Sequence, residues 1–154
     1  MSVVPSLPAP WRTLCALAVL VSMSGCRPDE PQRLAIRIAG VPARVEIAAD
    51  PQSRGQGLME RAELGPDEGM LLVFPRERPI RLWMLNTHIP LDAGFFDGQG
   101  VLVGKAAMRP DGGKEIHSSP RPARYALEMN LGWFERHGIA PGSRLELPYP
   151  IQGQ

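Results

Sequence analysis

Residues 93–108 constrain the fold of this 154-residue chain more than any other segment. Residues 93–96 and 101–108 are rich in aromatic, aliphatic and β-branched side chains, which favour strands. Between them lies Asp97-Gly98-Gln99-Gly100, where the two glycines can adopt the positive φ angles that tight turns require. The pattern therefore predicts an antiparallel hairpin.

The strand pattern continues on both sides of this hairpin. Residues 34–39 and 43–48 alternate apolar and polar side chains around Gly40-Val41-Pro42, which predicts a second hairpin. Residues 69–74 form a continuous apolar run and predict a buried strand. Further strands are predicted for residues 80–85, 124–131 and 143–147. The chain is thus expected to be mostly β.

Alternation within two of these strands predicts which side chains share a face. In residues 80–85, Trp83 falls on the face opposite Leu82 and Met84. In residues 124–131, an apolar face (Tyr125, Leu127, Met129) opposes a polar one (Glu128, Asn130). The segments 75–79 and 110–122 are rich in Pro and in charged or small residues, and predict surface loops.

Helices are expected to be few and short. Asp50-Pro51 combines an N-cap side chain with a preset φ, which predicts a helix over residues 52–59. Gly55 and Gly57 each disfavour that helix by about 1 kcal/mol relative to Ala. Close packing of the helix on the sheet would explain them, and an anion site is the alternative. Residues 132–137 predict one helical turn that ends at Gly138.

The first 25 residues have the pattern of a signal peptide rather than of the folded domain. Arg12 is the only charge before Arg27, and residues 14–21 form an apolar run too short to span a membrane. Met23-Ser24-Gly25-Cys26 then resembles a lipoprotein processing site, which predicts lipid attachment at Cys26. An ordinary secretory signal, or an uncleaved anchor, remains the alternative.

This N-terminal pattern predicts an exported, membrane-anchored protein. Two or more acyl chains anchor a protein stably, so the membrane would be its first partner. Residues 26–33 would form the lipidated Cys and a tether, followed by a domain over residues 34–148 and a tail over residues 149–154. Arg27, rather than Asp, follows Cys26, which in a diderm bacterium favours the outer membrane, facing the periplasm.

Composition excludes several kinds of site. With residues 1–25 removed and Cys26 lipidated, no thiol remains for a disulfide, a Cys-ligated metal or a nucleophile. Basic and acidic residues are nearly balanced, which argues against a nucleic-acid partner. No zinc-spaced histidine pair, phosphate loop, dinucleotide fingerprint or catalytic triad occurs, so no cofactor is predicted.

Four sequence blocks occur in a fixed order along the chain. They are RGQGLMER at residues 54–61, GMLLVF at 69–74, WMLNTHIPLD at 83–92 and LEMNLGW at 127–133. With them the chain resembles, over residues 35–147, the family catalogued as domain of unknown function 192. The resemblance implies a compact β-rich domain, often secreted or lipid-anchored, and implies no particular activity.

Together these patterns predict an α+β fold that is mostly β. We expect one compact domain, rich in antiparallel pairing, in which a partly closed barrel carries one or two short helices. The oligomeric state and the identity of any ligand do not follow from the sequence.

Residues 83–92 hold the densest mixture of buried-type and reactive side chains. The first hypothesis is that they line a shallow binding pocket with an aromatic wall and a few directed polar groups, formed by Trp83, Asn86, Thr87, His88 and Asp92. A small molecule, glycan or peptide would then be the ligand. Arg54 would hold either an acidic ligand group or an internal carboxylate. In the alternative, Asn86 and Asp92 bind turn backbone, and Trp83 packs in the core.

Two other hypotheses concern chemistry. A hydrolase-type enzyme could use Asp92, Glu128 and His88 as acid and base if the fold brings them together. Cu(I) binding could use the thioethers of Met59, Met70, Met84, Met108 and Met129 with a histidine. The first requires both carboxylates on one side of the domain, and the second requires at least two sulfurs and one imidazole to converge at the surface.

Overall fold

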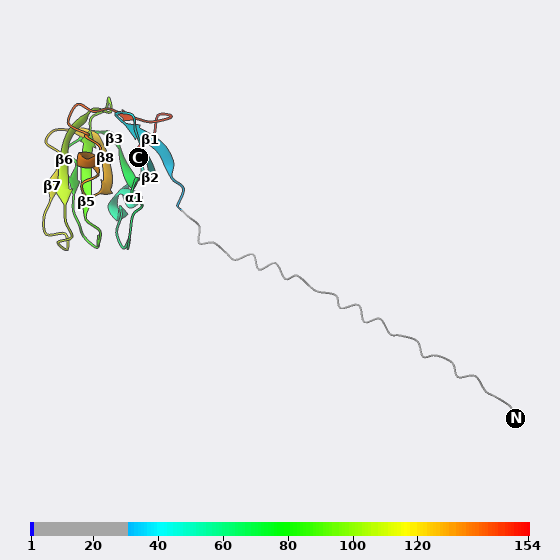
Figure 1. The fold of residues 1–154 in the computed structure, drawn as a ribbon. Helices are drawn as coiled ribbons and strands as arrows, with labels where there is room; N and C mark the ends of the chain where they lie inside the picture. The colour runs from blue at the N-terminus through cyan, green and yellow to red at the C-terminus, as the bar shows by residue number, and fades with distance from the viewer. Residues whose placement is uncertain (2–30) are drawn as a thin grey trace. The chain divides into compact units, whose positions relative to one another are not determined.

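The computed structural model describes Met1 and residues 31–154. The predicted signal peptide, Cys26 and most of the predicted tether lie outside the described residues. Residues Pro31–Gln154 form a compact unit by themselves (Figure 1). In this described part of the chain, no helix is both long and apolar enough to cross a membrane.

The compact unit is built on one seven-stranded sheet. Its strand order is β6-β5-β8-β3-β2-β1-β9, and a two-stranded sheet pairs β4 with β7. The elements of residues 31–154 are β1 (Leu34–Ile38), β2 (Val41–Ala48), α1 (Pro51–Gln56), β3 (Glu68–Arg78), β4 (Arg81–Leu82), β5 (Leu91–Phe96), β6 (Leu102–Met108), β7 (His117–Ser118), β8 (Ala123–Asn130), α2 (Trp133–Arg136) and β9 (Leu145–Glu146). Only β2 and β3 pair in parallel within the seven-stranded sheet. The predicted α+β, mostly β domain is confirmed.

The two ends of the seven-stranded sheet approach each other at one corner. Val101, next to β6, forms a bridge with Arg144, next to β9. The amide of Leu102 donates to the carbonyl of Ser143, and that of Leu145 to the carbonyl of Gly100, both at 2.8 Å. These bonds curl the sheet into the partly closed barrel that the sequence predicted.

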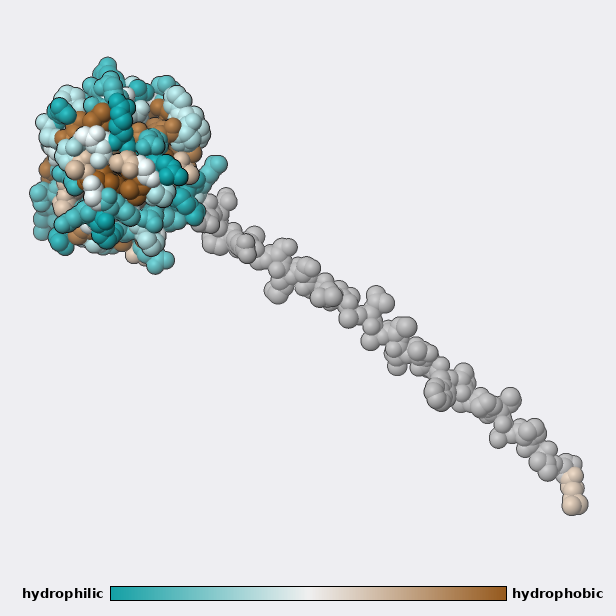
Figure 2. Space-filling view, turned by 45° about the horizontal axis from the view of Figure 1, so that its top comes forward, coloured by the Kyte–Doolittle hydropathy of each residue, from teal (hydrophilic) through white to brown (hydrophobic). Residues whose placement is uncertain are grey.

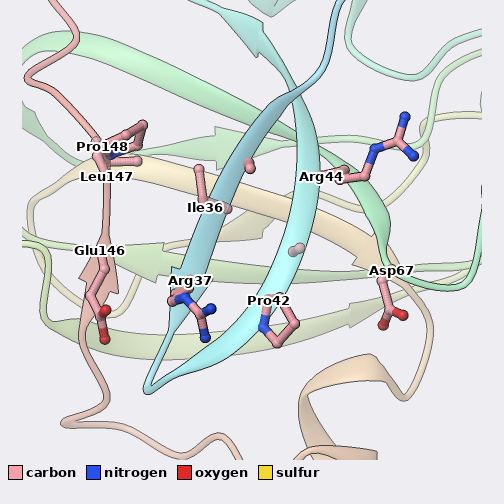
Figure 3. A pocket seen from close by; sticks show the side chains of 10 residues that line it. Ile36, Arg37, Pro42, Arg44, Asp67, Glu146, Leu147 and Pro148 are labelled. Carbon is pink, nitrogen blue, oxygen red and sulfur yellow. The ribbon is translucent and has the colours of Figure 1, made fainter.

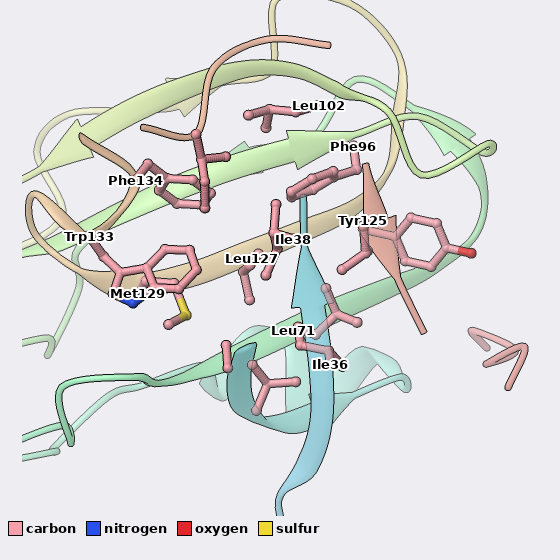
Figure 4. Close-up of a cluster of buried hydrophobic side chains, with 14 of the residues drawn as sticks. Ile36, Ile38, Leu71, Phe96, Leu102, Tyr125, Leu127, Met129, Trp133 and Phe134 are labelled. Carbon is pink, nitrogen blue, oxygen red and sulfur yellow. The ribbon is translucent and has the colours of Figure 1, made fainter. Parts of the chain in front are cut away.

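The concave face of the sheet encloses the inner core (Figure 4). It combines residues of both sheet ends, Leu102 on β6 and Leu145 on β9, with side chains of the central strands. Trp133 and Phe134 of α2 fill one part of it and are fully buried. Gly94 on β5 makes room for the ring of Phe134, since a Cβ there would lie 2.5 Å from it. The inner core therefore fixes where α2 sits.

A second, outer core covers the opposite face of β2, β3, β8 and β5. Phe95 belongs to it, whereas its neighbour Phe96 points into the inner core. Segments outside the sheet supply the cover, namely Leu58, Ile80, Leu82, Met84 and Ile89. The central strands are thus buried on both faces. The outer surface shows polar residues with apolar patches between them (Figure 2).

The first helix is shorter than predicted. Asp50 caps it as expected, because its carboxylate accepts from the amide of Ser53 at 2.9 Å. The helix ends at Gln56, and Gly57 is its C-cap with φ +50°. The explanation of both glycines by close packing on the sheet is wrong. A Cβ on Gly55 would meet open space, and Gly57 is required by its positive φ.

Two other segments differ from the sequence prediction. β3 runs on through the expected charged loop to Arg78, with an irregular register between Val73 and Arg78. The strand expected over residues 80–85 shortens to Arg81–Leu82, which pairs with β7. The predicted alternation nevertheless holds there, since Leu82 is buried while Trp83 is half exposed.

Candidate functional site

Glu128 is the most unusual charged residue of the outer core. It lies on β8, directly opposite Met70 on β3 and Ala93 on β5, in the middle of the sheet. The sequence predicted a polar face for this part of β8. Instead Glu128 is buried, with 6% of its surface exposed. The reason is that α1 and residues 57–59 and 81–87 cover this face.

A cavity of about 250 Å³ lies over Glu128. Its walls are mostly apolar and come from β3, β5 and the covering segments, and they include Leu72, Leu82, Met84, Leu91 and Met59. Gly57 closes one side, and a Cβ built on it would lie 3.6 Å from Oε2 of Glu128. A single carboxyl group thus faces a small, largely apolar space.

Glu128 finds no partner for one carboxyl oxygen. Among the described residues, its Oε2 is buried without any hydrogen-bond partner. Burial alone raises the pKa of Glu128 from 4.5 to about 7, because the charged form is poorly solvated there. A polar group left in this state costs free energy of folding, so an explanation by function is warranted.

Trp83 and Thr87 join the cavity from the covering segment. Trp83 follows β4 and keeps half of its surface exposed, although indole rings are usually buried. Thr87 is buried, and its hydroxyl donates to the carbonyl of Leu85 at 3.2 Å. Both residues belong to the predicted site, and the structure brings them to the same space as Glu128.

Arg54 also lines the cavity, but its guanidinium is engaged elsewhere. It donates to the carbonyls of Ala49 (2.7 Å) and Val73 (2.8 Å) and to the main-chain oxygen of Gln154 (2.7 Å). Its planar group also lies 4.9 Å from the centre of the Phe74 ring. The expected ion pair with an internal carboxylate is therefore replaced by main-chain oxygens. Arg54 ties α1, β3 and the chain end together beside the cavity.

Asn86 and His88 lie outside the cavity lining. Asn86 is exposed with φ +50°, and its carbonyl accepts from the amide of Glu60 at 2.8 Å. The imidazole of His88 is exposed and lies 3.2 Å from the carboxylate of Glu60. These two predicted site residues therefore hold the turn next to residues 57–61 rather than face the enclosed space.

Asp92 lies on the opposite face of the sheet from Glu128. It is paired with Met129, one residue further along β8, and successive strand residues point to opposite faces. Burial raises the pKa of Asp92, and hydrogen bonds from the main chain of Gly132 and Phe134 lower it less strongly. Asp92 therefore accepts hydrogen bonds from the main chain at the start of α2. The acid–base grouping of Asp92, Glu128 and His88 does not form.

The copper hypothesis also lacks its required geometry. Met129 belongs to the inner core, whereas Met70, Met84 and Met108 belong to the outer one. Met59 and Met84 line the cavity, but its lining contains no histidine. In the part of the chain that the structure describes, no group of three or more His, Cys, Asp or Glu residues is placed to hold a metal ion.

A larger hollow of about 560 Å³ lies along β1, β2 and residues 146–148 (Figure 3). Its charged side chains come from exposed residues, among them Arg37 and Glu146. Asp67 already accepts from the indole of Trp133 at 3.0 Å. The buried, partnerless oxygen of Glu128 has no counterpart in this lining. We therefore take the smaller cavity as the candidate site.

Comparison with known proteins identifies the family. The model of domain of unknown function 192, described as "Uncharacterized ACR", matches residues 34–147. The chain belongs to this family. No curated protein matches it. The domain of unknown function 192 thus includes the cavity and every residue that lines it.

Two solved structures are similar to this chain. One is a protein from Sinorhizobium meliloti described as a candidate transcription regulator, with 38% identity and a TM-score of 0.70, covering 75% of this chain and 93% of its own. The other, of unknown function, is from Novosphingobium aromaticivorans, with 28% identity and a TM-score of 0.70, covering 90% of this chain and 99% of its own. Almost the whole Sinorhizobium chain thus aligns with three quarters of this one.

Proposed function

We propose that this domain binds a small, largely apolar molecule in the cavity over Glu128. The observation that carries the proposal is the position of Glu128, which lines the cavity and whose buried Oε2 has no hydrogen-bond partner among the described residues. Binding sites commonly combine apolar walls with a few polar groups that orient the ligand. Glu128 would supply that orienting group, and a bound molecule would remove the cost of leaving it unpaired.

The cavity limits the size of the ligand. Its volume of about 250 Å³ lies just below the usual range for drug-sized ligands, roughly 300–1,000 Å³. Leucine and methionine contribute six of the fifteen lining residues, and the lining also includes Trp83, whose ring is half exposed. This supports a ligand with an apolar body of the size of a single ring or short chain, carrying one polar group.

Methionine methyl groups provide a direct test. The isolated unit of residues 31–154, labelled with ¹³C at the methionine methyls, would be titrated with benzylamine, benzyl alcohol and benzoate. Met59 and Met84 line the cavity, whereas Met129 lies in the inner core and serves as an internal control. We expect at least one probe to shift the Met59 and Met84 resonances and to leave that of Met129 unchanged.

Trp83 allows a matched comparison of variants. Because half of its surface is exposed, Trp83→Ala should leave the fold intact and weaken probe binding by removing the aromatic wall. Tyr149→Ala removes another exposed aromatic ring that lies outside the cavity lining and should have no effect. If none of the three probes moves the Met59 and Met84 signals at millimolar concentration, the binding proposal is wrong.

We further propose that the domain acts at the cell envelope, held to a membrane by lipid on Cys26. The support is the sequence of residues 14–26, together with the need for two or more acyl chains for stable anchoring. Cys26→Ser should release the protein from the membrane fraction or leave an unprocessed precursor. Unchanged processing and membrane association would contradict this location. Nucleic-acid binding is not proposed, since basic and acidic residues are nearly balanced.

A further inference from the structure

Two glutamates occupy one row across the outer face of the sheet. Glu46 on β2 is paired with Met70 on β3, and Met70 is paired with Glu128 on β8. Both glutamates are buried, but they differ in their ion pairs. Arg61 forms a hydrogen-bonded ion pair with Glu46, and Arg33 lies 3.8 Å from it. Glu128 forms no ion pair of this kind within residues 31–154.

The cavity contains two cationic residues, but neither neutralises Glu128. Arg54 directs its guanidinium to three main-chain oxygens and to the Phe74 ring. Arg81 is exposed on β4. Burial is the only cause of the raised pKa of Glu128, and no nearby positive charge lowers it. No cation of residues 31–154 therefore balances the charged form of Glu128.

Trp83 is a second group of the lining that attracts cations. Trp83 lines the cavity with an indole ring that is half exposed. The face of an indole attracts ammonium groups more strongly than other aromatic rings do. A carboxylate at the floor and an indole at the entrance are the two elements that bind amines in water-excluded sites. Thr87, also in the lining, adds a neutral hydroxyl.

We propose that the polar group of the ligand is a protonated amine, which forms an ion pair with the carboxylate of Glu128. This inference rests on the binding function proposed above and specifies the ligand class: a small amine with an apolar body. Amine binding would provide Glu128 with the partner that Arg61 provides for Glu46. A neutral ligand would instead need Glu128 to stay protonated and to donate a hydrogen bond.

Benzylamine and benzyl alcohol distinguish the two cases, because they share a ring and differ in the polar group. At pH 8 we expect benzylamine to bind residues 31–154 at least about tenfold more tightly, as fitted from the Met59 and Met84 shifts. Glu128→Gln should abolish that preference. Glu60→Gln removes an exposed carboxylate that contacts His88 outside the cavity lining, and should preserve it.

The pH profile of the unsubstituted protein gives an independent readout. Between pH 6 and 8 the ionised fraction of a carboxyl with a pKa of about 7 rises from roughly one tenth to nine tenths. The other charged residues of the lining are Arg54 and Arg81, and guanidinium groups do not titrate in this pH range. Benzylamine affinity should therefore rise up to about tenfold, whereas that of benzyl alcohol should stay level or fall.

Each outcome separates the two proposals. Equal affinity for amine and alcohol, or a benzylamine affinity that falls from pH 6 to pH 8, overturns the amine inference and leaves the binding function standing. The same holds if Glu128→Gln binds benzylamine as tightly as the unsubstituted protein. Absence of binding by every probe overturns both proposals. If Glu128→Gln does not fold, the pH profile alone decides.

Discussion

Glu128→Gln should make the domain more stable at alkaline pH without changing it much at acidic pH. The substitution keeps the shape of the side chain and removes its ability to ionise. In the folded protein, burial without a partner disfavours the charged form of Glu128 and raises its pKa from 4.5 to about 7. The folded state therefore binds more protons than the unfolded state between these two pH values, and stability falls as the pH rises through them.

The size of this effect follows from the two pKa values. Each pKa unit corresponds to about 1.4 kcal/mol, so a rise from 4.5 to about 7 corresponds to about 3 kcal/mol. Below pH 4.5 Glu128 is protonated in both states and contributes no penalty. Above pH 7 the penalty is complete. We therefore expect the unfolding free energy of Glu128→Gln, relative to the unsubstituted domain, to increase by about 3 kcal/mol between pH 4.5 and 8.5.

Urea denaturation of residues 31–154 measures this difference directly. Unfolding free energies would be extrapolated to zero urea at several pH values for both proteins. Other titrating groups act equally in the two proteins and cancel in the difference. Glu63→Gln, at an exposed residue, is the control and should give a difference that does not vary with pH. A constant gap for Glu128→Gln would refute the reasoning, because the carboxyl would then be balanced by a partner or by water.

Five further single-residue variants test the local structure of the domain. Gly57→Ala should destabilise the domain by about 1–3 kcal/mol, because Gly57 has φ +50°. Gly55→Ala lies in open space within α1 and should stabilise the domain by about 0.4–1 kcal/mol. Similar melting temperatures for these two variants would contradict the prediction. Asp92→Ala should cost about 1–2 kcal/mol, because it removes the acceptor of the main-chain hydrogen bonds from Gly132 and Phe134. An unchanged melting temperature would contradict this. Asn86→Ala should destabilise the domain by about 1 kcal/mol, because residue 86 has a positive φ. Asn86→Gly should not destabilise it. Equal melting temperatures for these two variants would show that the backbone at residue 86 is unstrained.

Much of the fold follows from local patterns in the sequence. The hairpin of β5 and β6 follows from strand-forming residues on either side of a glycine-containing turn, and that of β1 and β2 from alternating strands around Gly40. Both form as predicted. Asp50-Pro51 marks the start of α1 because an N-cap and a preset φ act within a few residues. The end of that helix depends on the turn at Gly57. Glycines stand both five and seven positions after the cap, and the sequence does not reveal which of them needs a positive φ.

The candidate site was predictable only in part, because covering segments decide which face of a strand is buried. Alternation placed Trp83 opposite Leu82 correctly, and Trp83, Thr87 and Arg54 do meet in one cavity. Asn86, His88 and Asp92 are close to them in sequence but point elsewhere, since a turn and the sheet itself separate them.

Glu128 shows why alternation alone misjudged the polar face of β8. Period-two patterning assumes that one face of a strand meets solvent, whereas β8 lies between β3 and β5 and is covered on both sides. One signal of this was present, because Ala126 stands on the same face as Glu128 and a solvent-facing strand rarely needs a small apolar residue there. In a strand buried on both faces, a glutamate without a partner opposes folding. Such a residue supports the proposal that the cavity binds a ligand.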